Sequence, residues 1–163
     1  MAPIYEFPVG FFDGASANLM GGIGVHLMIN YDHYICMKMC VGQSTNTRSE
    51  LLALWTLLFS AQLFGLPYLH IHGDSSVIIN WFNRRSTFSR TSTLSSLSLN
   101  GWCQNIRDLE SCFIQLDVVH IFREYNDMAN GLFKEALSMA SGLFQYSEFI
   151  EGECTKHGSF QLF

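Results

Sequence analysis

The fold is decided by the stretch Thr45-Asn46-Thr47-Arg48-Ser49-Glu50-Leu51, which opens the clearest helical pattern in the chain. Asn46 is a favourable helix cap, and Gly65-Leu66-Pro67 would end the helix. Glu50 lies at helical spacing before an apolar stripe, so it heads the face that turns toward the core. The position also suits an acid stabilised by the positive end of the helix, and this simpler explanation of Glu50 stays open. The stripe consists of Ala53, Leu54, Leu57, Leu58 and Ala61.

Short apolar segments on both sides of this helix predict β-strands. Residues 9–12, 23–29 and 34–41 precede it, with a Gly-Gly turn before the second of them, and indicate an antiparallel meander. After it we expect a strand at 68–72, helices at 77–82 and 102–109, a strand at 113–122 and an amphipathic helix at 127–140. The order β-β-β-α-β-α-α-β-α predicts an α/β fold with a mixed five-stranded sheet flanked by helices.

The length of 163 residues fits one domain, in which we expect a core at 7–143 and a tail at 144–163 without a clear pattern. A hydrophobic fraction of 48% with 14% charged residues excludes a disordered chain, and no apolar run reaches the ~20 residues of a membrane helix. The amino terminus lacks the basic and then apolar order of a signal peptide. We therefore expect a monomer without membrane contact, inside the cell in the nucleus or the cytoplasm.

Five cysteines form no paired framework, which favours small buried hydrophobic side chains in a reducing compartment over disulfides. Cys36 and Cys40 could share a strand face, and His70 and His72 could share another, which leaves a metal site of these four as a weak alternative.

The formal net charge of −5 argues against a general affinity for nucleic acid, so any such site must be local. Residues 86–98 are rich in Ser and Thr without stable periodicity, which predicts a mobile loop. Arg84, Arg85 and Arg90 accompany this loop and could contact phosphates, although a solvated loop explains them equally well.

Two further carboxylates stand where an apolar side chain would serve stability better. Asp13 follows the apolar residues 9–12, and a buried ionised group is costly unless a cation or several donors compensate it. Asp74 ends a strand. Each has an ordinary explanation, as a turn residue for Asp13 and as a helix cap for Asp74. Together with Glu50 they can converge on one edge of the sheet, where hard oxygen ligands would suit Mg²⁺.

The local motifs resemble those of the ribonuclease H family. Phe12-Asp13-Gly14-Ala15-Ser16 resembles its first catalytic strand, Gly21-Gly22-Ile23-Gly24-Val25 its second, Thr45–Leu51 its Thr-Asn-x-Arg-x-Glu-Leu helix entry, and Gly73-Asp74-Ser75 its Asp-Ser. Arg123-Glu124-Tyr125-Asn126 with Ala129-Asn130-x-Leu132 is similar to the Arg-Glu-x-Asn-x-x-Ala-Asp-x-Leu ending of archaeal-like cellular enzymes and plant LINE retrotransposon polyproteins. The resemblance covers residues 7–143.

The resemblance implies endonucleolytic hydrolysis of the RNA strand of RNA/DNA hybrids with two divalent ions, Mg²⁺ or Mn²⁺. It places Asp13 between the two ions, with Glu50 and Asp74 sharing them around the scissile phosphate. It also implies a partner, a reverse transcriptase domain of the same polyprotein.

Substrate contacts are implied in the same way. Backbone groups of Gly14, Ala15 and Ser16, with Asn46 and Ser76, would lie beside the RNA and its 2′-hydroxyls. Thr45 and Asn18 would hold a phosphate of the DNA strand, a role compatible with a loop hydroxyl at Thr45 and a helix cap at Asn46. Ser76 stands where bacterial relatives often carry Gln. The other candidate substrate-binding residues at this edge are Arg48 and Ser75.

The chain departs from the family pattern at the fourth acid, where Asn130 replaces Asp. An amide keeps a metal-ligating oxygen but loses the charge, which puts the strength of the second metal site in doubt. Asp127 could assist through water or cap the helix. Arg123 is nearest the place where many relatives carry a mobile His, and is our remaining catalytic candidate, while His120 is expected as a structural side chain within the strand.

Two other functions stay open because of Asn130. The chain could be a nucleic-acid-binding module with weak or no catalysis, or a structural domain that stabilises a neighbouring polymerase. The three retained carboxylates favour an enzyme, because a pure binder has no need for buried uncompensated charge.

Overall fold

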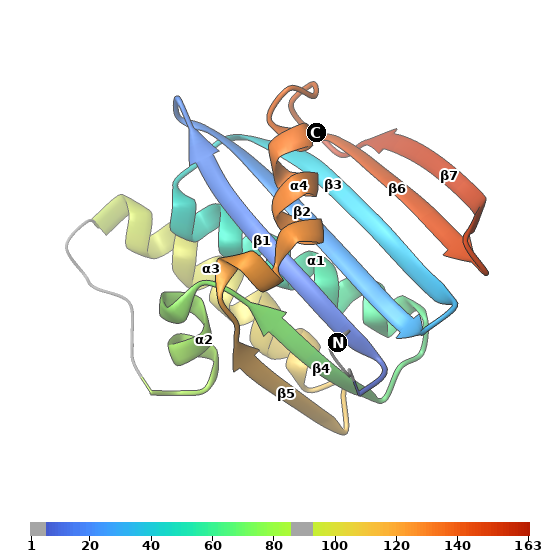
Figure 1. Cartoon of the computed structure of the whole chain (residues 1–163). Helices are drawn as coiled ribbons and strands as arrows, with labels where there is room; N and C mark the ends of the chain where they lie inside the picture. The colour runs from blue at the N-terminus through green and yellow to red at the C-terminus, as the bar shows by residue number, and fades with distance from the viewer. Residues whose placement is uncertain (1–5, 86–92) are drawn as a thin grey trace.

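The computed structural model describes residues 6–85 and 93–163, and of residues 93–98 only the backbone. Its strands and helices follow one another along the chain (Figure 1) as β1 (Val9–Ala17), β2 (Met20–Asn30), β3 (His33–Gln43), α1 (Asn46–Leu63), β4 (Tyr68–Gly73), α2 (Ser76–Phe82), α3 (Thr93–Glu110), β5 (Gln115–His120), the 3₁₀ turn η1 (Arg123–Tyr125), α4 (Asp127–Ala136), β6 (Leu143–Ile150) and β7 (Glu153–Gln161).

The strands form one mixed sheet in the order β5-β4-β1-β2-β3-β6-β7. β1, β4 and β5 run parallel to one another, as strands joined by helix-containing connections do. The pairs β1–β2, β2–β3 and β6–β7 are antiparallel hairpins, and β6 also pairs antiparallel with β3, which is distant from it in sequence. The predicted α/β class with a mixed sheet is therefore confirmed. The predicted count of five strands is wrong, since the sheet has seven.

The two additional strands come from the segment 144–163, for which the sequence indicated no pattern. Glu151 and Gly152 both adopt positive φ, 52° and 80°, which is the backbone of a tight two-residue hairpin. β6 pairs with β3 and β7 with β6. Neither strand contains a buried residue, so no alternation of apolar and polar residues marks them in the sequence.

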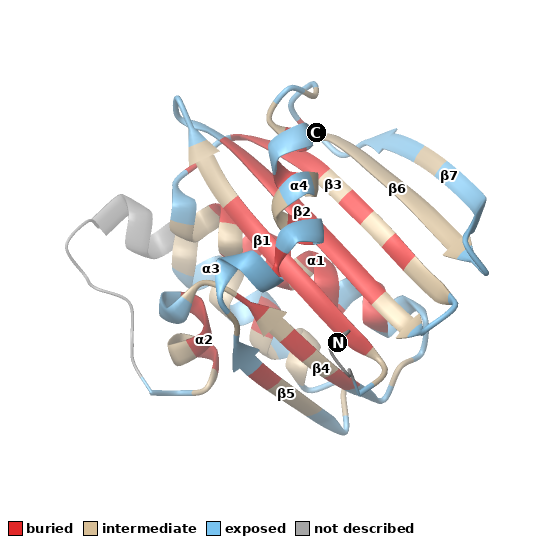
Figure 2. Cartoon of the chain, viewed as in Figure 1, coloured by how far each residue is buried: buried red, intermediate tan, exposed pale blue. Residues whose placement is uncertain are grey.

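Two layers of helix cover the sheet (Figure 1), with α1 and α3 on one face and α4 on the other. Most of the core lies between α1 and the central strands (Figure 2), and the predicted stripe on α1 is entirely buried. A smaller apolar cluster around Val9, Phe11 and Ala129 lies under α4. In the described part of the chain, no helix has the length and apolar character needed to cross a membrane.

Several predicted boundaries are wrong. The β1–β2 turn is made by Asn18 and Leu19, with φ of 51° and 68°, while the Gly-Gly pair lies inside β2. The cap of α1 is Thr45, whose side chain accepts the Arg48 N–H, and not Asn46. Both errors have the same direction, because the turn was assigned three positions too late and the cap one position too late.

The later helices differ from the prediction as well. α3 begins at Thr93, so residues 93–98 are helical and not loop, while residues 86–92 lie outside the described part of the chain. α4 ends at Ala136 instead of residue 140, and the strand predicted at 113–122 is limited to Gln115–His120, which is β5.

Glycines on β2 bring α4 close to the sheet. A Cβ on Gly24 would collide with the Ala129 carbonyl oxygen, and would lie 2.6 Å from the Phe133 backbone nitrogen. A Cβ on Gly22 would lie 2.6 Å from the Phe133 carbonyl oxygen. Backbone atoms of a helix cannot move singly, so these two positions require residues without a side chain.

We expect Gly24→Ala to lower the free energy of unfolding by about 3 kcal/mol, because the added methyl group pushes α4 away from β2. Urea denaturation of both proteins measures this difference. Gly131→Ala is the matched control, since a Cβ on this α4 residue would meet no described atom within 4 Å apart from its chain neighbours and the nearby backbone of its own helix. The control should be neutral or stabilising by up to ~1 kcal/mol. Equal stability of Gly24→Ala and the parent would contradict the close approach.

Candidate active site

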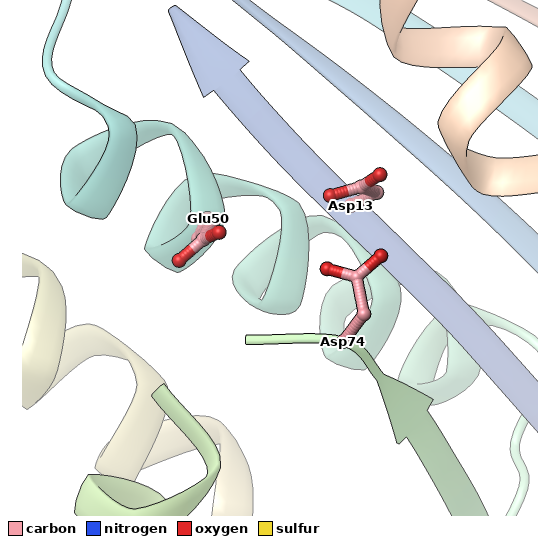
Figure 3. A group of neighbouring side chains, drawn as sticks. All are labelled: Asp13, Glu50 and Asp74. Carbon is pink, nitrogen blue, oxygen red and sulfur yellow. The ribbon is translucent and has the colours of Figure 1, made fainter. Parts of the chain in front are cut away.

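Three carboxylates from three elements meet at one edge of the sheet (Figure 3). Asp13 lies on β1, Glu50 on α1, and Asp74 directly after β4. β1 and β4 are parallel and Phe12 pairs with Gly73, so the next residues, Asp13 and Asp74, follow at corresponding places on neighbouring strands. One oxygen from each carboxylate lies within 4.8 Å of the others. The convergence expected from the sequence is therefore present.

Burial and mutual repulsion make two of these groups, Asp13 and Glu50, hard to ionise. Asp13 is 4% exposed, and desolvation, together with the neighbouring Asp74, raises its pKa from 3.8 to about 6. Desolvation raises the pKa of Glu50 from 4.5 to about 7, and both aspartates add to this rise, while a hydrogen bond with Ser75 opposes it. The cluster thus holds more negative charge at neutral pH than its surroundings stabilise.

Amide groups supply much of the compensation. Asn130 Nδ2 donates to Asp13 Oδ2 at 3.0 Å, and the Gly14 N–H donates to Asp13 Oδ1 at 2.9 Å. Asn126 Nδ2 donates to Asp74 Oδ2 at 3.3 Å. Asn126 was part of a quoted motif but received no role from the sequence. Its spacing of four residues from Asn130, which places Asn126 just before α4 on the side of the helix that carries Asn130, was the available signal.

Positive charge at the cluster is limited. Within the described residues, the one ion pair to it joins Arg123 Nε to Asp74 Oδ2 at 3.9 Å, and the Arg123 side chain is 79% exposed. Hard carboxylate oxygens, crowded together and poorly neutralised, are the donor set that Mg²⁺ and Mn²⁺ accept. The residues present therefore fit a divalent cation.

Solved structures with a similar fold include several ribonucleases H. Ribonuclease H1 of the halophilic archaeon Halobacterium salinarum NRC-1 has a TM-score of 0.71 at 24% identity, over 80% of this chain and 96% of that chain. The N-terminal ribonuclease H domain of a Mycobacterium tuberculosis protein, solved as a fusion with maltose-binding protein, has a TM-score of 0.67 at 18% identity, over 80% and 98% of the two chains. LC11-RNase H1 in complex with an RNA/DNA hybrid has a TM-score of 0.66 at 22% identity, over 79% and 95%. These similarities confirm the ribonuclease H-like fold.

A search of curated protein sequences finds no match. A family profile described as "Reverse transcriptase-like" matches residues 11–136, a segment that includes all three carboxylates and Asn130. The chain is a reverse transcriptase-like domain of the ribonuclease H family. The family resemblance drawn from the motifs is thereby confirmed.

The predicted RNA-side residues of this ribonuclease H domain lie at the end of β1 and the start of α1. The Ser16 backbone N–H and hydroxyl both donate to Asn46 Oδ1, at 2.8 and 3.2 Å, which links the two segments. Gly14 packs against α1, since a Cβ there would lie 2.5 Å from the Ser49 carbonyl oxygen. Ala15 lies between Gly14 and Ser16 on β1. The assigned contacts of these residues with RNA stay predictions.

Three of the other candidates near this edge have structural roles in the domain. Thr45 caps α1, Asn18 forms the β1–β2 turn, and Ser75 caps α2 by accepting the Ile78 N–H at 3.4 Å. Ser76 is the exposed first residue of α2. Arg48 Nη1 is buried without a hydrogen-bond partner among the described residues, and burial lowers the pKa of its guanidinium.

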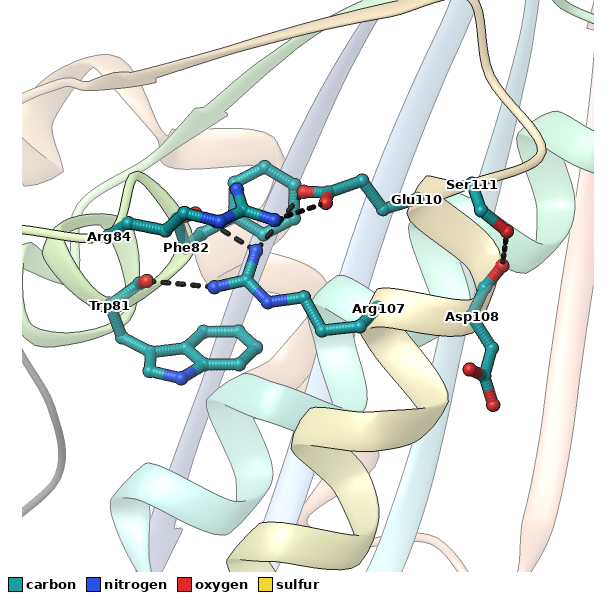
Figure 4. A network of polar contacts seen from close by, with 7 residues as sticks. All are labelled: Trp81, Phe82, Arg84, Arg107, Asp108, Glu110 and Ser111. Carbon is teal, nitrogen blue, oxygen red and sulfur yellow. Dashed lines mark hydrogen bonds and ion pairs between the residues drawn. The ribbon is translucent and has the colours of Figure 1, made fainter.

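Arg84 is held away from the role of a free phosphate ligand (Figure 4). Its Nη2 donates to Glu110 at 2.8 Å, and Glu110 also binds Arg107 at 3.1 Å. Arg107 stacks on Trp81, 4.3 Å from its ring centroid, so this network joins the end of α2 to α3. Arg85 is exposed, and Arg90 lies outside the described residues.

One minor expectation is confirmed and another is wrong. His120 lies within the strand, as the exposed last residue of β5, and its Nε2 lies 3.2 Å from the Asp74 carbonyl oxygen, as expected of a structural side chain. Asp127 is the exposed first residue of α4, and the cap position belongs to Asn126.

The alternative metal site of cysteines and histidines is also wrong. Cys36 and Cys40 lie on β3, whereas His70 and His72 lie on β4, and β1 and β2 separate these strands. Three strand spacings of ~4.8 Å are too far for one ion to bridge. Among the described residues, the carboxylate trio is the one group found with metal-binding geometry.

We expect Mg²⁺ to raise the melting temperature at about pH 8 and to have little effect at about pH 5. Asp13 and Glu50 have raised pKa values, so their charges destabilise the metal-free fold above pH 6 to 7, and protonation relieves this cost as the pH falls. His26 acts oppositely, because burial lowers its pKa to about 4, but its contribution is the same with and without Mg²⁺. Thermal denaturation with and without millimolar Mg²⁺ measures the difference.

The control for this titration is Asp32→Asn, which removes an exposed carboxylate in the β2–β3 turn. It should leave the response to Mg²⁺ unchanged. A response to Mg²⁺ of equal size at both pH values would contradict binding by Asp13 and Glu50.

Proposed function

We propose that this domain hydrolyses the RNA strand of RNA/DNA hybrids endonucleolytically. The observation that carries the proposal is the convergence of Asp13, Glu50 and Asp74 at one sheet edge, in a fold shared with a ribonuclease H1 solved with an RNA/DNA hybrid. Buried, repelling carboxylates reduce stability, so their presence is best explained by a cation and a phosphate that bind there.

Asp13, Glu50, Asp74 and the oxygen of Asn130 would hold two divalent ions, Mg²⁺ or Mn²⁺, which supply activation of the attacking water and stabilisation of the departing 3′ oxygen. The chain's own residues arrange the site. β1 and β4 fix the two aspartates, and α1 fixes Glu50. Arg123 pairs with Asp74 from the solvent side, and its exposed guanidinium would also contact a phosphate. The downstream fragment would keep the 5′ phosphate.

Hybrid recognition would use the segment that joins β1 to α1. The Asn46 amide oxygen already accepts two hydrogen bonds from Ser16, so its nitrogen is left to donate to a 2′-hydroxyl. Gly14, Ala15 and Ser76 would lie beside the RNA strand, and Asn18 and Thr45 would bind a phosphate of the DNA strand. The remaining polar contacts with the hybrid would come from Arg48, Ser75, Arg85 and Arg90. Arg84 is a weaker member of this set because Glu110 binds it.

A binding module with attenuated catalysis is the second candidate, and Asn130 is the observation that favours it. Its amide donates to Asp13, which partly satisfies the carboxylate without a cation. A domain of this kind could bind a hybrid and cut it slowly. As the parent protein we propose a retrotransposon polyprotein with a reverse transcriptase domain, a context supported by the reverse transcriptase-like family and the motif ending at Leu132.

We expect cleavage of an RNA/DNA hybrid to exceed cleavage of double-stranded DNA of the same sequence by at least about tenfold, because contacts with the 2′-hydroxyl are possible only with the hybrid. Binding should weaken with added salt as phosphate contacts release counterions. Gel assays with both labelled duplexes in Mg²⁺ measure the ratio. Equal cleavage of both would indicate a general nuclease.

A further inference from the structure

The side chain of Asn126 is enclosed, with 1% exposed, at the position before α4. An Asn at this position usually caps the helix by accepting an N–H two or three residues later. Here the side chain makes no such bond, and Oδ1 has no hydrogen-bond partner among the described residues. Helix capping therefore does not explain why this side chain is buried.

The nitrogen of the same amide uses both of its hydrogens. Nδ2 donates to the Phe12 carbonyl oxygen at 3.0 Å and to Asp74 Oδ2 at 3.3 Å. Phe12 precedes Asp13 on β1 and pairs with Gly73, which precedes Asp74. Asn126 Nδ2 thus links β1, the strand that carries Asp13, to the carboxylate of Asp74.

We infer that Asn126 is a positioning residue that fixes the Asp74 carboxylate against β1 in the orientation that meets a divalent cation. The inference deepens the proposed function and rests on it for the role of that cation. A neutral amide suits the task, because it holds a carboxylate without competing for its charge as Lys or Arg would. Asn130 makes the equivalent bond to Asp13 one helical turn later, so α4 and the residue that precedes it provide an amide donor to each aspartate.

The test compares Asn126→Ala with Asn83→Ala in the full chain. Asn83 is the matched control, because its Nδ2 donates to the Val118 carbonyl oxygen at 3.1 Å but contacts none of the carboxylates. We expect both variants to lower the melting temperature in chelator. Asn126→Ala alone should weaken Mg²⁺ affinity, measured by calorimetric titration without nucleic acid, by about tenfold or more. In cleavage assays it should lower kcat and leave KM for the hybrid unchanged.

The parent protein gives a second measurement that does not depend on the variant's folding. In a Mg²⁺ titration followed by ¹⁵N NMR, the side-chain amide of Asn126 should shift at the same midpoint as metal binding, and that of Asn83 should not. If Asn126→Ala binds Mg²⁺ with the affinity of the parent, or if the NMR signal of the Asn126 amide does not shift with Mg²⁺, Asn126 has only a structural role. If the parent binds Mg²⁺ but cleaves no hybrid, the proposed function fails while the affinity comparison still decides the role of Asn126.

Discussion

Asp13→Asn is expected to reduce cleavage of an RNA/DNA hybrid by at least about a thousandfold. Asp13 contacts the Asn130 amide and lies beside the acidic Asp74. A cation held by Asp13 would stabilise the transition state by several kcal/mol. Each ~1.4 kcal/mol of lost stabilisation lowers the rate about tenfold. An amide at residue 13 keeps the shape but not the charge. Single-turnover assays in saturating Mg²⁺ measure the loss.

The same substitution should make the metal-free protein more stable at about pH 8. The rise in the pKa of Asp13 from 3.8 to about 6 corresponds to about 3 kcal/mol of unfavourable ionisation, which Asn does not incur. The amide oxygen can still accept from Gly14, and Asn130 can turn its own amide to present oxygen to the new donor. A stable variant that retains full cleavage would refute the assignment of Asp13, whereas an unfolded one would refute the account of its burial.

Asn130→Asp is expected to raise cleavage by on the order of a hundredfold at Mg²⁺ concentrations well below saturation, and less at saturation. A carboxylate in place of the amide adds a full negative charge ~4 Å from a bound divalent cation. At an effective dielectric constant of ~20 this attraction is about 4 kcal/mol for each unit of cation charge, or about 8 kcal/mol for Mg²⁺, before repulsion among the acids is subtracted. The two side chains have nearly the same shape, so α4 should keep its place. Cleavage rates across a Mg²⁺ titration test this.

Without metal, the same change should be unfavourable. It replaces the donor that binds Asp13 Oδ2 at 3.0 Å with a like charge, so stability in chelator at about pH 8 should fall, and hybrid binding in chelator should weaken. Asn130→Asp should therefore lower the affinity for the hybrid in chelator while it raises the cleavage rate in Mg²⁺. If the Asp variant cuts no faster at any Mg²⁺ concentration, Asn130 is not the fourth ligand position, and the binding module becomes the better explanation.

The sequence predicted the parts of the fold that have strong local signals. The apolar stripe on α1 is buried as expected, because helical spacing and burial coincide there. β6 and β7 could not be found, because their pairing depends on β3, which is distant in sequence, and their side chains are at most half-buried. The start of α3 was hidden by residues 93–98, whose Ser-rich composition favours loops more than helices.

The candidate site could also be predicted only in part from the sequence. Asp13, Glu50 and Asp74 were predicted from their placement on elements and from motifs, and the parallel pairing of β1 and β4 places the two aspartates on neighbouring strands. The role of Asn126 could not be predicted, since it depends on which way a buried amide turns. The pairing of Arg84 with Glu110 likewise depends on where α3 lies relative to α2.

The most direct test is cleavage of an RNA/DNA hybrid whose RNA strand carries a label, by the parent protein in Mg²⁺, in Mn²⁺ and in chelator. We expect internal cuts in the RNA strand only, with 5′ phosphates on the downstream fragments, in both metals and none in chelator. Cleavage that persists in chelator, or an intact hybrid at every metal concentration, would contradict hydrolysis by the Asp13, Glu50 and Asp74 cluster.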